Sequence, residues 1–289
     1  MKAPKFAYAR VLEVDEAIAT LAAGAGAAKA MSGSQSLGPM LNLRLARPAQ
    51  VVDVAHIPGL RAVTRKADWV EIGAAVTHAE IEDGVHAPLT DHPMRQVARG
   101  IAYRAIRTRG TLGGSLAHAD PAADWVVTLA ALGARVAIRS PRGERTAEAD
   151  AFMLGAYTTV LEPDELIVAI SVPSQTPTTH WGYHKVCRKP GEFAEASAAV
   201  YFDASRKCAR IVLGAVDGPP LLLHTLAAEI ALKGTVVAGR EALRAAVHAA
   251  LPERDAIDRK LFTACLERAL DQSGICLLYT SPSPRDRQK

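Results

Sequence analysis

The sequence predicts an α+β protein with two domains. Its 289 residues, of which 49% are hydrophobic and 22% charged, are enough for two domains and a sizeable hydrophobic core. The first part of the chain mixes short apolar strands with amphipathic helices, whereas the last part places three strands before three helices. A polar connector with two prolines, at 173–177, lies between these parts and is typical of a domain boundary.

Apolar spacing and capping residues predict the elements before the connector. Val14, Ile18 and Leu21 recur at helical spacing, and Gly24 can end that helix. Thr77 is suited to cap a second short helix. Further helices are expected at 93–99 and 123–132. The expected strands lie at 27–31, 51–54, 62–64, 70–73, 135–138 and 165–172, the third and fourth of them forming a hairpin.

The elements after the connector form one block of strands and then one block of helices. The strands are expected at 182–186, 196–202 and 209–216. The helices are expected at 225–233, 241–250 and 258–270. Residues 277–289 are rich in proline and serine and then densely charged, and they resemble a translated cloning adaptor. We therefore expect 277–289 to be a disordered, non-native tail.

Charge and cysteine usage argue against several classes of function. The net charge of +4 is small and scattered, so nucleic acid is not an expected partner. The four cysteines form no C-x-x-C pair and are expected to be reduced, buried thiols that bind no metal. The histidines at 56, 78, 86 and 92 are scattered and expected at the surface. There is no membrane-length apolar run and no signal peptide, so the expected compartment is the cytoplasm.

The stretch 104–125 carries the strongest local signal in the chain. Basic residues lead into Gly110, Thr111, Gly113, Gly114 and Ser115, and an acidic segment ending at 124 follows. Glycines can expose backbone N–H groups to an anion, and the hydroxyls can add donors. The stretch is therefore interpreted as a phosphate cradle with a carboxylate shortly after it. The alternative is a tight turn between a helix and a strand.

A second polar loop, 30–37, favours the cradle interpretation. It also joins small residues, a glycine and hydroxyls after a short apolar run. Neither loop is the G-x-G-x-x-G fingerprint or a P-loop. Two such loops can hold a pyrophosphate from both sides, which suits a dinucleotide bound between two subdomains.

These motifs resemble those of one known family. The loop 32–37 with 40–44, and the stretch 106–115 with 120–124, are similar to the two signatures of the FAD-binding subunit of molybdenum hydroxylases. That family includes the medium subunit of aerobic carbon monoxide dehydrogenase and the FAD subunit of xanthine dehydrogenases. Residues 183–194 resemble its third block, and the likeness is collinear over about 1–272.

The resemblance implies a particular domain organisation. A FAD-binding domain of the PCMH or vanillyl-alcohol-oxidase-like fold would cover 1–175, with subdomains at about 1–55 and 56–175. A small α+β domain of the carbon monoxide dehydrogenase flavoprotein type would cover 178–275.

The resemblance also assigns the cofactor FAD to particular residues. The first loop and the second stretch would contact the pyrophosphate, Asp124 a hydroxyl, Ile167 the flavin pocket, and Lys185 would place a cation nearby. The full expected set is Ala30, Met31, Ser32, Gly33, Ser34, Gln35, Ser36, Leu37, Ile101, Thr111, Leu112, Gly113, Gly114, Ser115, Asp124, Ile167 and Lys185. Position 34 departs from the family, which often has a second glycine there. Phe193 stands where an aromatic ring often lies near the isoalloxazine.

The function implied is that of an electron-transfer subunit of a molybdenum-containing hydroxylase. FAD would take electrons from [2Fe–2S] clusters in a small partner subunit and pass them to an external acceptor. The molybdenum cofactor would belong to a large partner subunit, and the complex would be a dimer of heterotrimers. The alternatives are a stand-alone FAD-dependent oxidoreductase with its own substrate pocket, and an assembly module without flavin.

Overall fold

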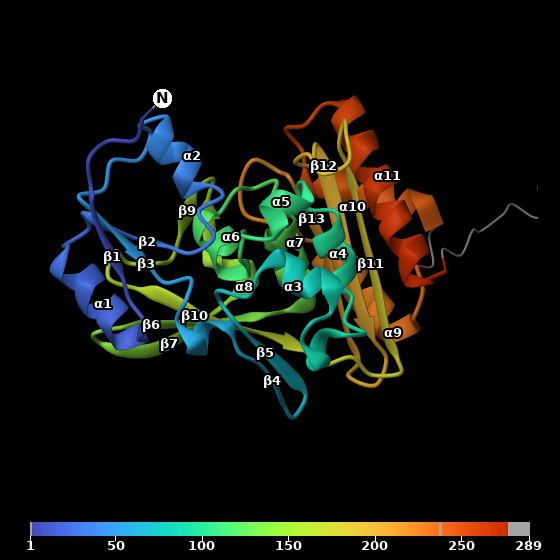
Figure 1. Ribbon diagram of the computed structural model, residues 1–289. Helices are drawn as coiled ribbons and strands as arrows, with labels where there is room; N and C mark the ends of the chain where they lie inside the picture. Colours follow the sequence, from blue (N-terminus) through green and yellow to red (C-terminus); the bar gives the residue numbers. More distant parts are fainter. Residues whose placement is uncertain (1, 237–238, 277–289) are drawn as a thin grey trace, which may run out of the picture.

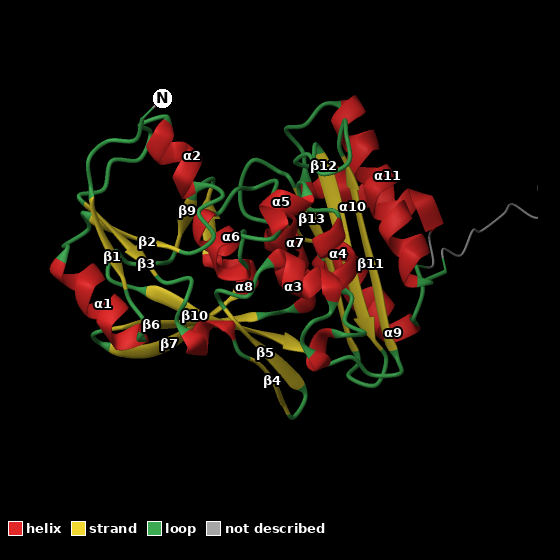
Figure 2. Cartoon of the chain, in the orientation of Figure 1, coloured by secondary structure: helices red, strands yellow, loops and turns green. Residues whose placement is uncertain are grey.

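The computed structural model describes residues 2–236 and 239–276, so the expected tail at 277–289 lies outside the described residues. Figure 1 shows a small sheet at one end of the molecule, a five-stranded sheet in the middle and a four-stranded sheet at the other end. Helices lie between and beside these sheets (Figure 2). The α+β prediction is confirmed.

The first sheet is parallel and has the strand order β1-β3-β2. Its strands are β1 (Ala7–Arg10), β2 (Ala28–Met31) and β3 (Gln50–Asp53). Helix α1 (Val14–Ala23) buries Ala17, Ile18 and Leu21 in the same core as Val52. Helix α2 (Leu37–Asn42) begins just after the loop that leaves β2.

The central sheet is antiparallel and has the strand order β4-β5-β10-β6-β7. Its strands are β4 (Val63–Lys66), β5 (Trp69–Gly73), β6 (Arg135–Ser140), β7 (Gly143–Glu148) and β10 (Leu166–Pro173). The helices that accompany it are α3 (His78–Asp83), α4 (Met94–Arg99), α5 (Arg104–Arg107), α6 (Leu112–His118), α7 (Asp124–Leu132) and α8 (Ala149–Phe152). Short elements complete it: 3₁₀ turns η1 (Pro58–Arg61) and η2 (Ala87–Leu89), and the hairpin β8 (Met153–Gly155) with β9 (Thr158–Thr159).

The third sheet is an antiparallel meander of β11 (Thr179–Val186), β12 (Ala196–Asp203), β13 (Cys208–Gly214) and β14 (Leu221–Leu222). Alternation along β12 separates its two faces. Ala198 and Val200 share a core with helices α9 (His224–Lys233), α10 (Gly239–Ala250) and α11 (Ala256–Ser273). Ala199 and Tyr201 belong to the other core, which contains α7.

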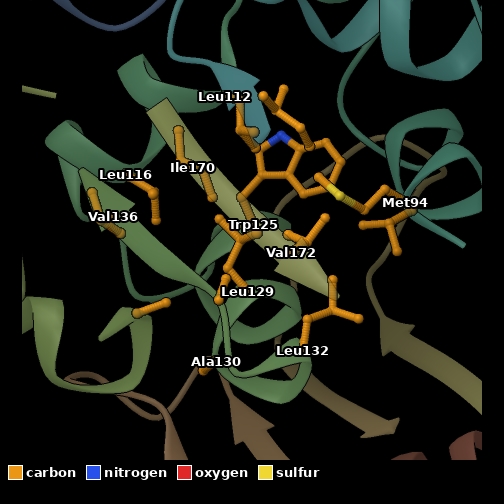
Figure 3. Close-up of a cluster of buried hydrophobic side chains, with 14 of the residues drawn as sticks. Met94, Leu112, Leu116, Trp125, Leu129, Ala130, Leu132, Val136, Ile170 and Val172 are labelled. Atoms are coloured by element: carbon orange, nitrogen blue, oxygen red, sulfur yellow. The ribbon is translucent and has the colours of Figure 1, made fainter. Parts of the chain in front are cut away.

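Helix α7 is the element that the central and third sheets share. All nine of its residues are buried, and its core includes residues of β10 and of β12. Figure 3 shows Trp125 and Leu129 of α7 beside Ile170 and Val172 of β10, with Met94 of α4 close by. The N-terminus of α7 is therefore held between the two halves of the chain.

Most elements expected from periodicity are present within a few residues of their expected bounds. Thr77 caps α3 as predicted, since its hydroxyl accepts from the N–H of Glu80 at 3.2 Å. The expectation of buried cysteines is wrong in part: all four thiols are free, but only Cys265 is buried and Cys276 is exposed.

Candidate functional site

The loop between β2 and α2 carries a run of unused backbone donors. In the part of the chain that the structure describes, no N–H group from Ser32 to Leu37 donates a hydrogen bond. The hydroxyl oxygen of Ser32 is buried and also has no partner there. Buried polar groups without partners are rare, and several convergent N–H groups form an anion-binding concavity. The loop is therefore built to receive an acceptor-rich ligand.

Gly33 brings this loop against the second glycine-bearing stretch. A Cβ atom at Gly33 would overlap the carbonyl of Arg109, so only glycine permits this approach. Ser34 adopts the left-handed region, with a φ of 60°. This conformation is more strained for serine than for the glycine that the family often has at this position. The Gln35 side chain donates to the carbonyl of Gly33 at 2.8 Å and stabilises the turn. The two predicted cradle loops thus lie in direct contact.

The second stretch differs from the expected open glycine loop. The N–H of Leu112 donates to Val76 at 3.0 Å, and that of Gly113 donates to Ala74 at 2.9 Å. Gly113 can approach this closely because it has no Cβ and packs against the Ala74 backbone. The N–H of Ser115 also donates within the helix, to the carbonyl of Thr111 at 3.0 Å, so the expectation of free N–H groups is wrong from Leu112 to Ser115. Thr111 caps α6 and accepts from the N–H of Gly114 at 3.2 Å. Gly114 is exposed and Ser115 is partly exposed.

His78 packs against this stretch at Gly110, although it was expected at the surface. Its backbone N–H donates to Gly110 at 2.9 Å, and its ring leaves no room for a Cβ at Gly110. The indole N–H of Trp125 donates to Nδ1 of His78 at 3.0 Å, which leaves the proton of the neutral ring on Nε2. His78 and His92 are both buried, so the expected surface position is wrong for both.

We expect acid to destabilise the protein through these two histidines. Burial lowers the pKa of His78 to about 4, and that of His92 to about 4. The unfolded chain binds more protons than the folded one between about pH 6.5 and 4, so stability falls as the pH falls through that window. The loss is about 1.4 kcal/mol per pKa unit for each group. Urea denaturation at pH 7.5 and 4.5 measures it, and His78→Asn, which keeps an acceptor near Nδ1, should reduce the pH dependence. An unchanged pH dependence in that variant would contradict the assignment.

Asp124, the first residue of α7, lies in a buried ionic cluster. Its exposed fraction is 6%, and Tyr183 of β11 donates its hydroxyl to Oδ1 at 2.7 Å. The ammonium of Lys185 lies 2.9 Å from Oδ1 and 3.1 Å from Oδ2. Burial raises the pKa of Asp124, and Lys185 and the Tyr183 hydroxyl oppose that rise. The structure thus brings together two of the residues expected to contact the cofactor.

Lys185 also joins two backbone segments. Besides Asp124, its ammonium donates to the carbonyl of Gly100 at 2.9 Å and to that of Glu192 at 3.2 Å. The two segments meet directly, because Gly191, with a φ of 90°, lies against the carbonyl of Ala102. The three protons of the ammonium are therefore engaged within the chain. An exposed aromatic ring follows on each segment, Tyr103 and Phe193.

The remaining expected residues are placed as follows. Ile101 is partly buried just after α4, and its carbonyl accepts from Arg107 at 2.9 Å. Ile167 is buried in β10 opposite Ile138, within the core that contains α7. Ala30 and Met31 end β2 and lead directly into the first loop.

The contacts of three residues in this region were not predicted, although Arg109 belongs to the basic residues before Gly110 and Tyr183 begins the block 183–194. Tyr183 and His78 are defined by contacts with residues far away in the chain, which spacing does not predict. Arg109 stands beside Gly33, is exposed, and makes no ion pair within the described ranges. Its neighbour Arg107, in contrast, binds Glu82 with Nε 2.8 Å from the carboxylate.

The described residues contain neither a metal-binding cluster nor a helix that could span a membrane. No cluster of three or more His, Cys, Asp or Glu side chains suited to a metal is present among residues 2–236 and 239–276. Across the same residues, every helix is too short or too polar to traverse a bilayer.

Comparison with known proteins places the chain in a family. The family described as "FAD binding domain in molybdopterin dehydrogenase" matches residues 4–175. The nicotine 6-hydroxylase medium subunit of Paenarthrobacter nicotinovorans is 38% identical over 75% of this chain and 77% of its own length. The carbon monoxide dehydrogenase medium chain of Hydrogenophaga pseudoflava is 34% identical over 86% of each chain.

Solved structures agree with this placement. A carbon monoxide dehydrogenase from Hydrogenophaga pseudoflava superposes with a TM-score of 0.85 at 33% identity, over 95% of this chain and 99% of that one. Quinoline 2-oxidoreductase from Pseudomonas putida 86 gives a TM-score of 0.82 at 32% identity, over 94% and 98%. The chain therefore belongs to the family of FAD-binding medium subunits of molybdenum-containing hydroxylases and dehydrogenases.

Proposed function

We propose that this chain binds FAD between its two polar loops and serves as the electron-transfer subunit of a molybdenum-containing hydroxylase. The observation that carries the proposal is the loop from Ser32 to Leu37, with its unused N–H groups and the buried, unpartnered hydroxyl of Ser32. A diphosphate offers many acceptor oxygens to such donors. Bound FAD would supply the redox chemistry.

The residues of the second stretch complete the site in this proposal. Gly114 and Ser115 present an accessible surface at the start of α6, while the N–H groups of Leu112 and Gly113 fix that surface to the segment that follows β5. Arg109 provides positive charge for the phosphates, since its guanidinium has no ion pair in the described chain. Ile101 and Ile167 supply apolar contacts, and Asp124 accepts from a hydroxyl of the cofactor.

The complex around the chain is part of the same proposal. A small subunit with [2Fe–2S] clusters would deliver electrons, and a large subunit with the molybdenum cofactor would act on the substrate, as a dimer of heterotrimers in the cytoplasm. Support comes from relatives that are described as medium subunits or medium chains. Electrons would leave to an external acceptor.

The test is an absorption spectrum of the purified chain, followed by chromatography of the released cofactor. We expect oxidised-flavin bands and about one FAD per chain. Gly114→Asp should abolish them, because the new side chain crowds Thr111 and repels the phosphates. Gly218→Asp, at a glycine with open space around it, is the matched control and should keep the flavin. A colourless wild-type protein that does not take up added FAD would overturn the proposal.

A further inference from the structure

We propose that Tyr183 is a positioning residue for the cofactor site: its hydroxyl orients the carboxylate of Asp124 and so couples FAD affinity to the docking of the third sheet on α7. This inference rests on the proposed function, because it assumes that Asp124 contacts FAD. Tyr183 itself needs no contact with the cofactor.

The geometry separates the roles of the two partners of Asp124. Tyr183 and Lys185 are two residues apart on β11 and therefore project from the same face of the sheet. Tyr183 donates to Oδ1 alone at 2.7 Å, whereas the ammonium of Lys185 lies within 3.1 Å of both oxygens. The phenol thus fixes the rotation of the carboxylate, and the ammonium fixes its charge. A carboxylate has about four lone-pair sites, so Oδ2 can still accept from a further hydroxyl.

Tyr183 is itself held firmly. Its side chain is buried, and its backbone N–H donates to the side chain of Gln272 in α11 at 3.0 Å. Burial raises the pKa of Tyr183 well above 10, so its hydroxyl remains a donor throughout the neutral range. The contact therefore connects α11 and β11 to the start of α7 by hydrogen bonds.

The protonation of Asp124 depends first on burial, then on Lys185 and then on the Tyr183 hydroxyl. Burial favours the neutral form of Asp124, and the donors from β11 favour the ionised form that a cofactor hydroxyl needs. The titratable groups that face the pair are Lys185 on the same strand and the thiols of Cys187 and Cys265 beside Tyr183. Without the phenol hydroxyl, the pKa of Asp124 rises further, and the carboxylate is neutralised at a higher pH.

The experiment is a titration of the purified chain, freed of flavin, with FAD between pH 5 and 8. Tyr183→Phe keeps the ring and removes only the hydroxyl. We expect this variant to bind FAD about tenfold more weakly at pH 7. We also expect its FAD affinity to begin to fall at a higher pH than that of the wild type as the pH is lowered. The matched control is Tyr201→Phe, because Tyr201 is also a buried tyrosine, and its hydroxyl accepts from Arg206 at 3.0 Å and does not touch Asp124. Tyr201→Phe should bind FAD like the wild type.

A double-mutant cycle distinguishes positioning from general damage to the core. If Tyr183 acts through Asp124, the variant Tyr183→Phe combined with Asp124→Asn should be no weaker than Asp124→Asn alone. Additive losses, or an unchanged FAD affinity and pH profile in Tyr183→Phe, would overturn the inference while the proposed function stands. If the wild-type protein does not bind FAD, the proposed function itself fails.

A measurement on the wild type covers the case in which Tyr183→Phe does not fold. Coupling between two sites is reciprocal, so FAD bound near Asp124 should slow amide hydrogen exchange in β11. We expect stronger protection over 182–186 when FAD is added. Protection confined to the two polar loops would contradict the coupling.

Discussion

Replacing Gly33 by alanine is expected to weaken FAD binding about 100-fold, the largest effect on affinity that we predict for one added methyl group. The Cβ atom would overlap the carbonyl of Arg109, and backbone on both sides must move to make room. Such a shift displaces the N–H groups of the first loop from the second stretch, and the unpartnered Ser32 hydroxyl moves with them. Titration with FAD, followed by flavin fluorescence, measures the change.

Gly59→Ala is the matched control for this substitution. Gly59 lies in η1, and a Cβ there meets no atom within 4 Å. It should bind FAD as the wild type does. If Gly33→Ala also binds FAD with wild-type affinity while it remains folded by circular dichroism, the contact between the two loops is not part of the cofactor site.

The local sequence pattern predicted the elements that have a clearly apolar face or a clear capping residue at their N-terminus. Helix α1 follows the spacing of its buried residues, and α3 begins at the capping box of Thr77. Strand β1 was missed because Ala7–Arg10 is largely exposed and has no apolar alternation. Helix α2 was missed because Gly38 and Pro39 are poor helix formers, although proline is tolerated in a first turn.

The sequence predicted which residues form the candidate site, but not which of them bond to one another. The polar loops were expected to contact the pyrophosphate and Asp124 a hydroxyl, and the structure places the loops in contact at Gly33. Sequence spacing could not show that the N–H of Gly113 donates to the carbonyl of Ala74, because that hydrogen bond depends on how closely α6 approaches the segment after β5. The pairing of Lys185 with Asp124 joins residues 61 positions apart, and no local pattern encodes it. Burial of His78 has the same origin, since Trp125 covers it only in the folded chain.

The largest loss of stability is expected from Asp203→Asn, at the end of β12. Asp203 is fully buried and accepts from the hydroxyls of Thr176 at 2.8 Å, Thr178 at 2.8 Å and Thr179 at 3.0 Å. Arg206 lies 3.3 Å from it, and these donors hold the pKa of Asp203 far below its usual range. The amide of asparagine has no charge and turns an NH₂ group toward donors. We expect the free energy of unfolding to fall by about 3 kcal/mol, measured by urea denaturation at pH 7.

Glu195→Gln is the control for the charge change alone. Glu195 pairs with Arg188, but both side chains are largely solvent-exposed, so its removal should change the free energy of unfolding by less than about 0.5 kcal/mol. An equally small effect of Asp203→Asn would contradict the importance of the buried charge.

Asp203→Asn also separates the stability of the connector at 173–177 from FAD binding at the Asp124 cluster. Asp203 pairs with Thr179, four residues along β11 from Tyr183, a distance of about 13 Å in a strand. Thr176 and Thr178 belong to the segment that joins the central and third sheets, and Thr179 is the first residue of β11. No atom of the Asp124 cluster contacts these threonines in the described structure. Asp203→Asn should therefore lower stability while folded molecules keep the wild-type affinity for FAD, whereas Tyr183→Phe should lower that affinity. If Asp203→Asn weakened FAD binding at temperatures far below its unfolding transition, the two ends of β11 would be coupled, and the site would depend on the whole third sheet rather than on the contact at Asp124.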